Sequence, residues 1–351
     1  MKTLAAVLDK INYPLSIEEL TIPELKHGQV LVKIAYSGIC HSQLNEIRGL
    51  KGEDKFLPHT LGHEGSGIVV EVGSGVQKVK VGDHVVLTWI KGSGLDIPAA
   101  QYHKHDGSVV NSGAISTFME YAVISENRLV PIPKETPLRE AALLGCAIPT
   151  GAGVVINTAG VSRGNSIAIF GMGGIGLSAL LAAQIKGAST IIAIDISEDR
   201  LKQASLLGAT HTLNANKENV VEDIFKITGG KGVDYAVESA GKKETMEMAF
   251  KSIRDKGGLC IITGNLSLGE MIQIDPFDLI KGKRIIGTWG GETFPDRDIP
   301  MYANWALSGK LDLKRLICRA YGLKDINEAI NCMENIAVGR ILLEIGECRD
   351  I

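Results

Sequence analysis

The sequence predicts an α/β protein with two domains, one built on a doubly wound parallel sheet and the other rich in β-strands. The chain has 351 residues, of which 45% are hydrophobic, and this content is ample for two sizeable cores. Residues 1–147 contain short alternating apolar runs, which are typical of a compact β domain. Residues 148–289 alternate apolar strands with helical segments, which is the pattern of a doubly wound sheet.

The elements follow from the spacing of apolar residues. In the first domain the sequence predicts three strands, at 29–35, 67–72 and 84–88. In the second domain it predicts a helix at 177–185 and four strands, at 166–170, 191–194, 233–238 and 258–263. Beyond the second domain it predicts a helix at 326–333 and a strand at 340–345.

Charge and composition argue against several classes of function. The net charge is −3 and no basic run stands out, so nucleic acid is not an expected partner. No run approaches 18 apolar residues and charges come too early for a signal peptide, so no membrane segment is expected. The six cysteines form no disulfide framework, which suits a reducing, cytoplasmic location. Four of them are interpreted as structural, namely Cys260, Cys318, Cys332 and Cys348.

A glycine-rich turn predicts a dinucleotide site. The strand at 166–170 is followed by a G-x-G-x-x-G motif that opens a helix, Gly171-Met172-Gly173-Gly174-Ile175-Gly176. The glycines permit a tight turn and let a pyrophosphate approach the helix N-terminus. The next strand ends at Asp195, whose carboxylate is expected to bind the ribose diol.

Asp195 also bears on the choice of cofactor. Its carboxylate would repel and crowd the 2′-phosphate of NADP, so NAD is the expected cofactor. Arg200 is a second candidate for contact with the adenosine ribose. The alternative for Arg200 is a solvated charge at the start of the next helix.

Three soft donors in the first domain predict a zinc site. Cys40, His63 and Cys146 would supply two thiolates and an imidazole, and would leave the fourth position of a catalytic zinc ion open. Glu64 is either an intermittent fourth ligand or a group just outside the ligands, and it is also a candidate catalytic residue. Taken singly, each cysteine and His63 has the alternative of a buried structural residue.

The chain resembles the zinc-dependent medium-chain alcohol dehydrogenases over nearly its whole length. The family pattern G-H-E-x2-G-x5-G-x2-V is matched by Gly62, His63, Glu64, Gly67, Gly73 and Val76. The segments 38–42 and 145–151 resemble those that carry the first and third zinc ligands of that family.

The resemblance implies a fold and an activity. It implies a GroES-like β-rich catalytic domain formed by residues 1–147 and 290–351, and a Rossmann dinucleotide-binding domain at 148–289. The implied reaction is reversible oxidation of a primary, secondary, polyol or sugar-like alcohol to an aldehyde or ketone, with hydride passing from a zinc alkoxide to nicotinamide. A homodimer or homotetramer is expected. The alternatives are a zinc-free quinone or enone reductase of the same superfamily and a non-catalytic NAD-binding protein.

The resemblance also implies roles for individual side chains. Ser42 would hold the alcohol and accept its proton, with a turn hydroxyl as the alternative. His41 would contact the cofactor pyrophosphate, and Arg340 would lie near the cofactor phosphates. A solvated loop histidine and a surface charge are the alternatives for these two residues.

The sequence departs from the family pattern in the region of the structural zinc lobe. No cysteine lies between His41 and Gly145, so the lobe is missing and one zinc per chain is expected. His103 and His105 with Asp106 stand in this region, where a histidine pair in a polar loop is more often solvated than metal-bound.

Two further departures lie near the zinc ligands. Gln43 replaces an aspartate next to the ligands, so either the zinc is more Lewis acidic or another acid supplies the missing interaction. Asn45 replaces a relay histidine, so water or the ribose hydroxyls are expected to take the alcohol proton.

Overall fold

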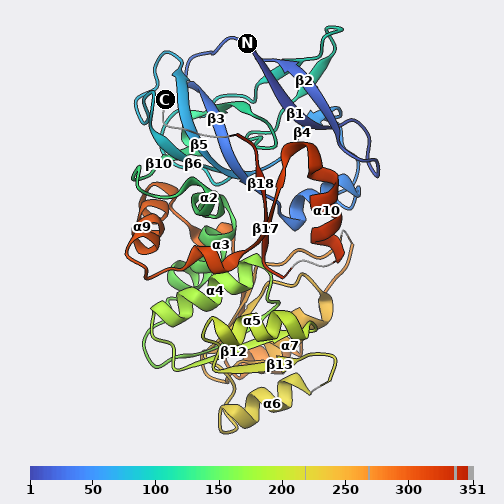
Figure 1. Cartoon of the computed structure of the whole chain (residues 1–351). Helices are drawn as coiled ribbons and strands as arrows, with labels where there is room; N and C mark the ends of the chain where they lie inside the picture. The colour runs from blue at the N-terminus through green and yellow to red at the C-terminus, as the bar shows by residue number, and fades with distance from the viewer. Residues whose placement is uncertain (218, 268, 336–337, 347–351) are drawn as a thin grey trace. The chain divides into compact units, whose positions relative to one another are not determined.

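The chain folds as two compact units. The computed structural model describes residues 1–217, 219–267, 269–335 and 338–346. One unit consists of Met1–Cys146 with Phe294–Ile351, and the other of Ala147–Thr293 (Figure 1). The sequence places the limits of the catalytic and cofactor domains at 147/148 and 289/290. These limits stay predictions.

The first unit contains a closed barrel and a larger sheet. The barrel runs in the order β1 (Lys2–Leu8), β2 (Ser16–Thr21), β7 (Gln101–His103), β8 (Val109–Asn111) and β4 (His59–Thr60). The larger sheet runs in the order β10 (Leu129–Pro131), β6 (His84–Thr88), β5 (Glu64–Val72), β3 (Gln29–Gly38), β18 (Arg340–Glu344) and β17 (Ile317–Gly322), with β9 (Tyr121–Ser125) also paired to β3. The late strand β18 therefore lies beside the early strand β3 (Figure 1).

Apolar side chains of the strands fill the core of the first unit. Strand β3 is buried on both faces, and Val30, Val32 and Ile34 lie in one apolar cluster with residues of β5, β6 and β9. A second cluster joins β1, β18 and the late helix α10 through Ala6, Leu343 and Ile330. The helices of this unit are α1 (His41–Ile47), α2 (Leu138–Ala141), α9 (Pro295–Leu307) and α10 (Ile326–Asn335), with 3₁₀ turns η1 (Glu126–Arg128), η2 (Ala142–Gly145), η5 (Leu313–Leu316) and η6 (Leu323–Asp325).

The second unit is a six-stranded parallel sheet with helices. Its strand order is β13 (His211–Asn214), β12 (Thr190–Asp195), β11 (Ser166–Phe170), β14 (Tyr235–Glu238), β15 (Leu259–Ile262) and β16 (Arg284–Gly287). The order reverses between β11 and β14, as in the doubly wound dinucleotide fold. The helical segments are α3 (Ala147–Gly153), the π-helix η3 (Val154–Thr158), α4 (Gly174–Ile185), α5 (Glu198–Leu206), α6 (Val220–Ile227), α7 (Lys243–Ser252), α8 (Pro276–Ile280) and η4 (Gly290–Glu292). The predicted fold class is confirmed.

The predicted elements differ from the observed ones mainly at their ends. The strand predicted at 166–170 coincides with β11, and the helix predicted at 177–185 is the later part of α4, which begins at Gly174. The strand predicted at 233–238 begins two residues later, at Tyr235. There Val233 pairs only with Ile253 in an isolated bridge, and Asp234 accepts a hydrogen bond from the Ser166 N–H.

Among the described residues, no single helix has the length and apolar composition needed to cross a membrane. One bent pair of helices, Leu138–Gly145 with Ala147–Thr158, meets that test by length and composition alone.

Candidate metal centre

Three sulfur and nitrogen donors come together in the first unit. Cys40 stands at the N-terminus of α1, His63 directly precedes β5, and Cys146 follows η2. Their ligand atoms all lie within 4.8 Å of one another, and His63 Nε2 lies 3.2 Å from Cys146 Sγ. This is the group of residues in which the sequence predicts a zinc site.

The register of the larger sheet brings the three loops together. Strands β3 and β5 are antiparallel, with Ser37 opposite Gly65, so the end of β3 and the start of β5 lie side by side. The turn before His63 needs glycine, because Gly62 has a φ of +97° and a Cβ there would clash with Thr117. The Cys146 loop is held to β6 by a hydrogen bond of 2.7 Å from Thr88 Oγ1 to the Gly145 carbonyl.

The electrostatics of the group favour a thiolate at Cys40. Contact with Cys146 lowers the pKa of Cys40 well below its ordinary value against the opposing effect of burial, and His63 and Arg340 lower it further. The thiolate is the form of cysteine that binds a metal. Two thiols and one imidazole form a donor set that fits tetrahedral zinc and leaves one position open for substrate.

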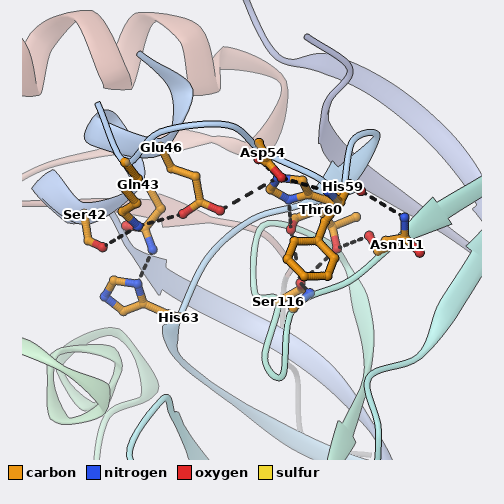
Figure 2. A network of polar contacts seen from close by, with 12 residues as sticks. Ser42, Gln43, Glu46, Asp54, His59, Thr60, His63, Asn111 and Ser116 are labelled. Atoms are coloured by element: carbon orange, nitrogen blue, oxygen red, sulfur yellow. Dashed lines mark hydrogen bonds and ion pairs between the residues drawn. The ribbon is translucent and has the colours of Figure 1, made fainter. Parts of the chain in front are cut away.

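Gln43 holds two of the three donors in place. Its Oε1 accepts a hydrogen bond of 2.9 Å from the Cys40 N–H. Its Nε2 contacts His63 Nδ1 (Figure 2). Gln43 is buried on the inner face of α1. The amide therefore contacts the ligands at the place where the family pattern has a carboxylate.

Glu64 and Arg340 form a buried ion pair beside the metal ligands. Glu64 is fully buried at the start of β5, and the Arg340 guanidinium at the start of β18 contacts its Oε1. The carboxylate oxygens of Glu64 are absent from the ligand group formed by Cys40, His63 and Cys146 in the described part of the chain. Coordination of zinc by Glu64 stays a prediction, and so does its catalytic role. The contact of Arg340 with a cofactor also stays a prediction.

A second polar cluster, which sequence reasoning missed, lies near the first. Glu46, Asp54 and His59 also place potential ligand atoms within 4.8 Å of one another, and Figure 2 shows the side chains of Glu46 and Asp54 directed at His59. Next to this cluster, Lys51 Nζ lies 2.9 Å from Ser42 Oγ. The sequence carries no distinct signal for these contacts, because isolated charged residues and single histidines are usually solvated.

Most of the remaining candidates lie at the surface or in the core of the unit to which they belong. His41 is exposed as the first residue of α1, and Asn45 is half-buried in the same helix. His103 ends β7, and both His103 and His105 are exposed; within the described residues neither belongs to a group of potential metal ligands. Among the cysteines interpreted as structural, Cys260 and Cys332 are buried, Cys318 is exposed, and Cys348 lies outside the described residues.

The glycine-rich turn of the second unit has the geometry of a dinucleotide site. Gly171 has a φ of +92°, and a Cβ at Gly176 would clash with the Gly171 carbonyl, so both positions need glycine. Nothing lies within 4 Å of a Cβ built on Gly173, at the N-terminus of α4, which leaves room for a pyrophosphate. Gly174 and Ile175 form the first turn of α4.

Asp195 is held beside this turn. It ends β12 with 7% of its surface exposed, and its Oδ2 accepts a hydrogen bond of 2.7 Å from the Met172 N–H. Its Oδ1 accepts one of 2.9 Å from the Ser197 N–H, and Arg200 Nη1 lies 3.8 Å from Oδ2. The turn lies at the end of β11, where the strand order reverses and dinucleotides bind in this fold.

Comparison with known proteins connects these features. Residues 26–134 match the alcohol dehydrogenase GroES-like domain and residues 174–307 match the zinc-binding dehydrogenase family. The chain is 33% identical to an S-(hydroxymethyl)glutathione dehydrogenase from Synechocystis, over 95% of this chain and 97% of the relative. The chain belongs to the zinc-binding medium-chain alcohol dehydrogenase family.

Solved structures of this family share the fold of the dehydrogenase. An alcohol dehydrogenase zinc-binding domain protein from Burkholderia ambifaria has a TM-score of 0.92 at 35% identity, covering 99% of this chain and all of the other. A benzyl alcohol dehydrogenase from Acinetobacter calcoaceticus has a TM-score of 0.90 at 33% identity over the same shares. The protein is a zinc alcohol dehydrogenase, and Cys40, His63 and Cys146 form its catalytic zinc group.

Proposed function

We propose that the dehydrogenase oxidises an alcohol reversibly to an aldehyde or ketone and uses NAD as the hydride acceptor. The Cys40–His63–Cys146 group carries this proposal, because its donors leave one position for a substrate oxygen. When bound there, zinc supplies a Lewis acid that polarises the oxygen of the substrate. One zinc per chain is expected, because the structural zinc lobe is missing.

The side chains around the zinc group have separate proposed roles in substrate binding, ligand orientation and charge balance. The Ser42 hydroxyl, two residues after Cys40 on α1, is proposed to hold the substrate hydroxyl and to receive its proton. Gln43 holds the Cys40 loop and the His63 ring. The Arg340–Glu64 pair keeps a buried negative charge neutralised beside the zinc, and an intermittent bond from Glu64 to zinc is part of the proposal.

The preference for NAD rests on Asp195. Hydrogen bonds from Met172 and Ser197 fix this carboxylate at the glycine-rich turn, where a 2′-phosphate would meet a negative charge. We expect Asp195→Ala to reduce the preference for NAD over NADP by about 100-fold in kcat/KM, which corresponds to about 3 kcal/mol. Asp199→Ala, on the exposed side of α5, is the matched control. An unchanged preference in Asp195→Ala would contradict the assignment.

The names of the relatives suggest which kind of alcohol is the substrate. Relatives at 33% identity are named for S-(hydroxymethyl)glutathione and a solved relative for benzyl alcohol, and both compounds carry a CH2OH group, which is bonded to sulfur in the first and to a ring carbon in the second. We propose a primary or secondary alcohol, with polyol and sugar-like alcohols included. NADH formation with a panel of such alcohols tests the proposal, together with zinc content per chain. Absence of turnover with every alcohol and every corresponding carbonyl would refute it.

We further propose a homodimer or homotetramer in the cytoplasm. The edge strand β16 exposes 40% of Ile286, and Trp289 just beyond it is 77% exposed, which supports pairing through this edge. A thiolate zinc group supports a reducing compartment. Analytical ultracentrifugation tests the assembly, and a monomer at micromolar concentration would contradict it.

A further inference from the structure

Lys51 makes a contact that places an ammonium group on the proposed proton acceptor. Ser42 and Glu46 are four residues apart on α1 and therefore share one face of the helix. The helix ends at Ile47, and Gly49 just beyond it has a φ of +68°, so the chain reverses and returns Lys51 to that face. Lys51 Nζ lies 2.9 Å from Ser42 Oγ and 3.0 Å from Glu46 Oε2.

The direction of the first hydrogen bond follows from chemistry. A lysine ammonium has three N–H donors and no acceptor, so Lys51 donates and Ser42 Oγ accepts. The proton of Ser42 is then free to point to another acceptor, such as the oxygen of a substrate. A second N–H of Lys51 is held by Glu46, and the side chain of Lys51 is 46% exposed, which gives it access to water.

Glu46 is itself held from its other side. Its Oε1 lies 3.8 Å from Nε2 of His59, which is buried and whose Nδ1–H donates to the Thr60 carbonyl at 3.0 Å (Figure 2). Asp54 Oδ2 lies 2.8 Å from the same Nε2. The carboxylate that contacts Lys51 therefore lies beside a buried histidine of the first unit.

We propose that Lys51 is a positioning residue that supplies and removes the substrate proton through Ser42. In carbonyl reduction, bound NADH would supply the hydride for the carbonyl carbon, and Ser42 and Lys51 would supply the proton for the oxygen that receives the C=O π-electron pair. The Ser42 O–H proton would then pass to that oxygen and a Lys51 N–H proton would pass to Ser42 Oγ. The neutral amine would recover its proton from a hydronium ion or a buffer acid, which supplies the one proton that the reduction consumes. In alcohol oxidation each transfer runs in reverse. Asn45, at the place of the family's relay histidine, has no titratable group for this task.

The test compares variants that separate charge from proton transfer. This inference rests on the proposed function, so it uses the zinc enzyme with NADH and a carbonyl substrate. Lys51→Met should lower kcat about 100-fold with KM changed little, because proton transfer is lost. Lys51→Arg keeps the positive charge but does not release a proton at neutral pH, so we expect it to be as slow as Lys51→Met. Added methylamine should restore part of kcat to Lys51→Ala in proportion to its concentration.

A second measurement needs neither metal nor cofactor. Amine-reactive labelling of the metal-free protein, read by mass spectrometry, should modify Lys51 several-fold more slowly than the exposed Lys55 of the same loop. Glu46→Gln should raise the labelling rate of Lys51 and leave that of Lys55 unchanged. Lys55→Met is the matched control for turnover and should keep the wild-type kcat.

The outcomes separate the inference from the function on which it rests. Wild-type turnover with an unchanged kcat in Lys51→Met would overturn the inference alone, and so would full activity in Lys51→Arg. Equal labelling of Lys51 and Lys55 would show that the contact with Glu46 is not made in solution and would also overturn it. A wild-type enzyme that reduces no carbonyl and oxidises no alcohol would overturn the proposed function, and the inference with it.

Discussion

Two clusters in the first unit each bring three potential metal ligands within 4.8 Å, and they differ in what their side chains already bind. In the zinc group, Gln43 holds the Cys40 backbone and the Nδ1 side of His63, while His63 Nε2 and the sulfur atoms face one another. In the second cluster, His59 Nε2 faces Asp54 at 2.8 Å. The comparison shows that the imidazole of the zinc group faces a sulfur ligand atom, whereas the imidazole of the second cluster is already in contact with a carboxylate.

The chemistry of the two clusters differs in the same sense. Thiolates and imidazole select zinc, whereas two carboxylates and an imidazole form a harder set. In the second cluster a cation is already present, because the Lys51 ammonium lies 3.0 Å from Glu46. We therefore expect one zinc per chain, bound by Cys40, His63 and Cys146.

The largest effect is expected when the zinc group loses a thiolate. Cys146→Ser should lower zinc affinity more than about 100-fold, because loss of a direct ligand exceeds the usual cost of losing an outer partner. Zinc content should fall from one per chain toward none, and turnover should fall with it. Cys318→Ser, at an exposed position, is the matched control and should keep both. Full zinc content in Cys146→Ser would contradict the ligand assignment.

A substitution in the second cluster should change the stability of the protein and not its metal content. His59→Gln leaves the contacts of the buried His59 with Asp54 and the Thr60 carbonyl incomplete, and we expect a loss of about 2 kcal/mol in the free energy of unfolding. Urea denaturation measures the loss, and elemental analysis should still give one zinc per chain. His105→Gln, at an exposed position, should change neither value. A wild-type content of two zinc ions that falls to one in His59→Gln would show that this cluster binds metal.

A smaller change in zinc affinity should test the role of the Gln43 amide beside the zinc ligands. Gln43→Asp restores a carboxylate that accepts a hydrogen bond from the Nδ1–H of a zinc-bound His63. We expect zinc affinity to rise about 10-fold, as measured by competition with a chelator. Gln101→Asp, at an exposed position in β7, controls for added negative charge. Unchanged or weaker zinc binding in Gln43→Asp would mean that the amide orients His63 as well as a carboxylate does.

The smallest effect is a pH dependence that comes from Asp54. Burial raises its pKa, but the Phe56 N–H and the His59 ring outweigh burial and hold the pKa below its ordinary value. A carboxyl whose pKa is lowered by folding adds stability above its unfolded pKa of about 3.9, and this stability is lost as pH falls through the folded value. We expect Asp54→Asn to lower the free energy of unfolding near neutral pH by less than about 1 kcal/mol and to remove this pH-dependent contribution.

Urea denaturation at neutral and acidic pH tests the contribution of Asp54. The difference between wild type and Asp54→Asn should be present near neutrality and shrink as pH falls below about 4. The exposed Asp255→Asn is the control. A difference that grows on acidification would show that the sign of the contribution is wrong.

The second unit illustrates what local sequence patterns predict well. The strand at 166–170 and the turn after it are specified by residues that are neighbours along the chain, and β11 and the Gly171 turn match them. Strand ends were less predictable, as at Val233, because pairing with a partner strand determines where a strand begins.

The first unit shows where local patterns are insufficient. The region 91–113 reads as a polar loop, yet β7 and β8 form a hairpin that completes the barrel. Tyr102 of β7 is buried, and its hydroxyl accepts a hydrogen bond of 2.8 Å from the Val123 N–H. The sequence also gives no indication that Lys51 is exposed while His59 is buried. Contacts between residues distant in sequence depend on sheet register and turn geometry, which no short window of sequence contains.

The sequence by itself determined the kind of protein, because ligand types, the glycine-rich turn and the family pattern are properties of the residues themselves. It therefore predicted the α/β fold, the zinc group and the family. Only the tertiary structure decided which polar side chains hold one another. The antiparallel register of β3 and β5 brings Cys40 to His63, and the reversal at Gly49 returns Lys51 to Ser42. The physical reason is that hydrogen bonds and metal ligation act over a few ångströms, whereas the sequence alone leaves the distances between remote residues undefined.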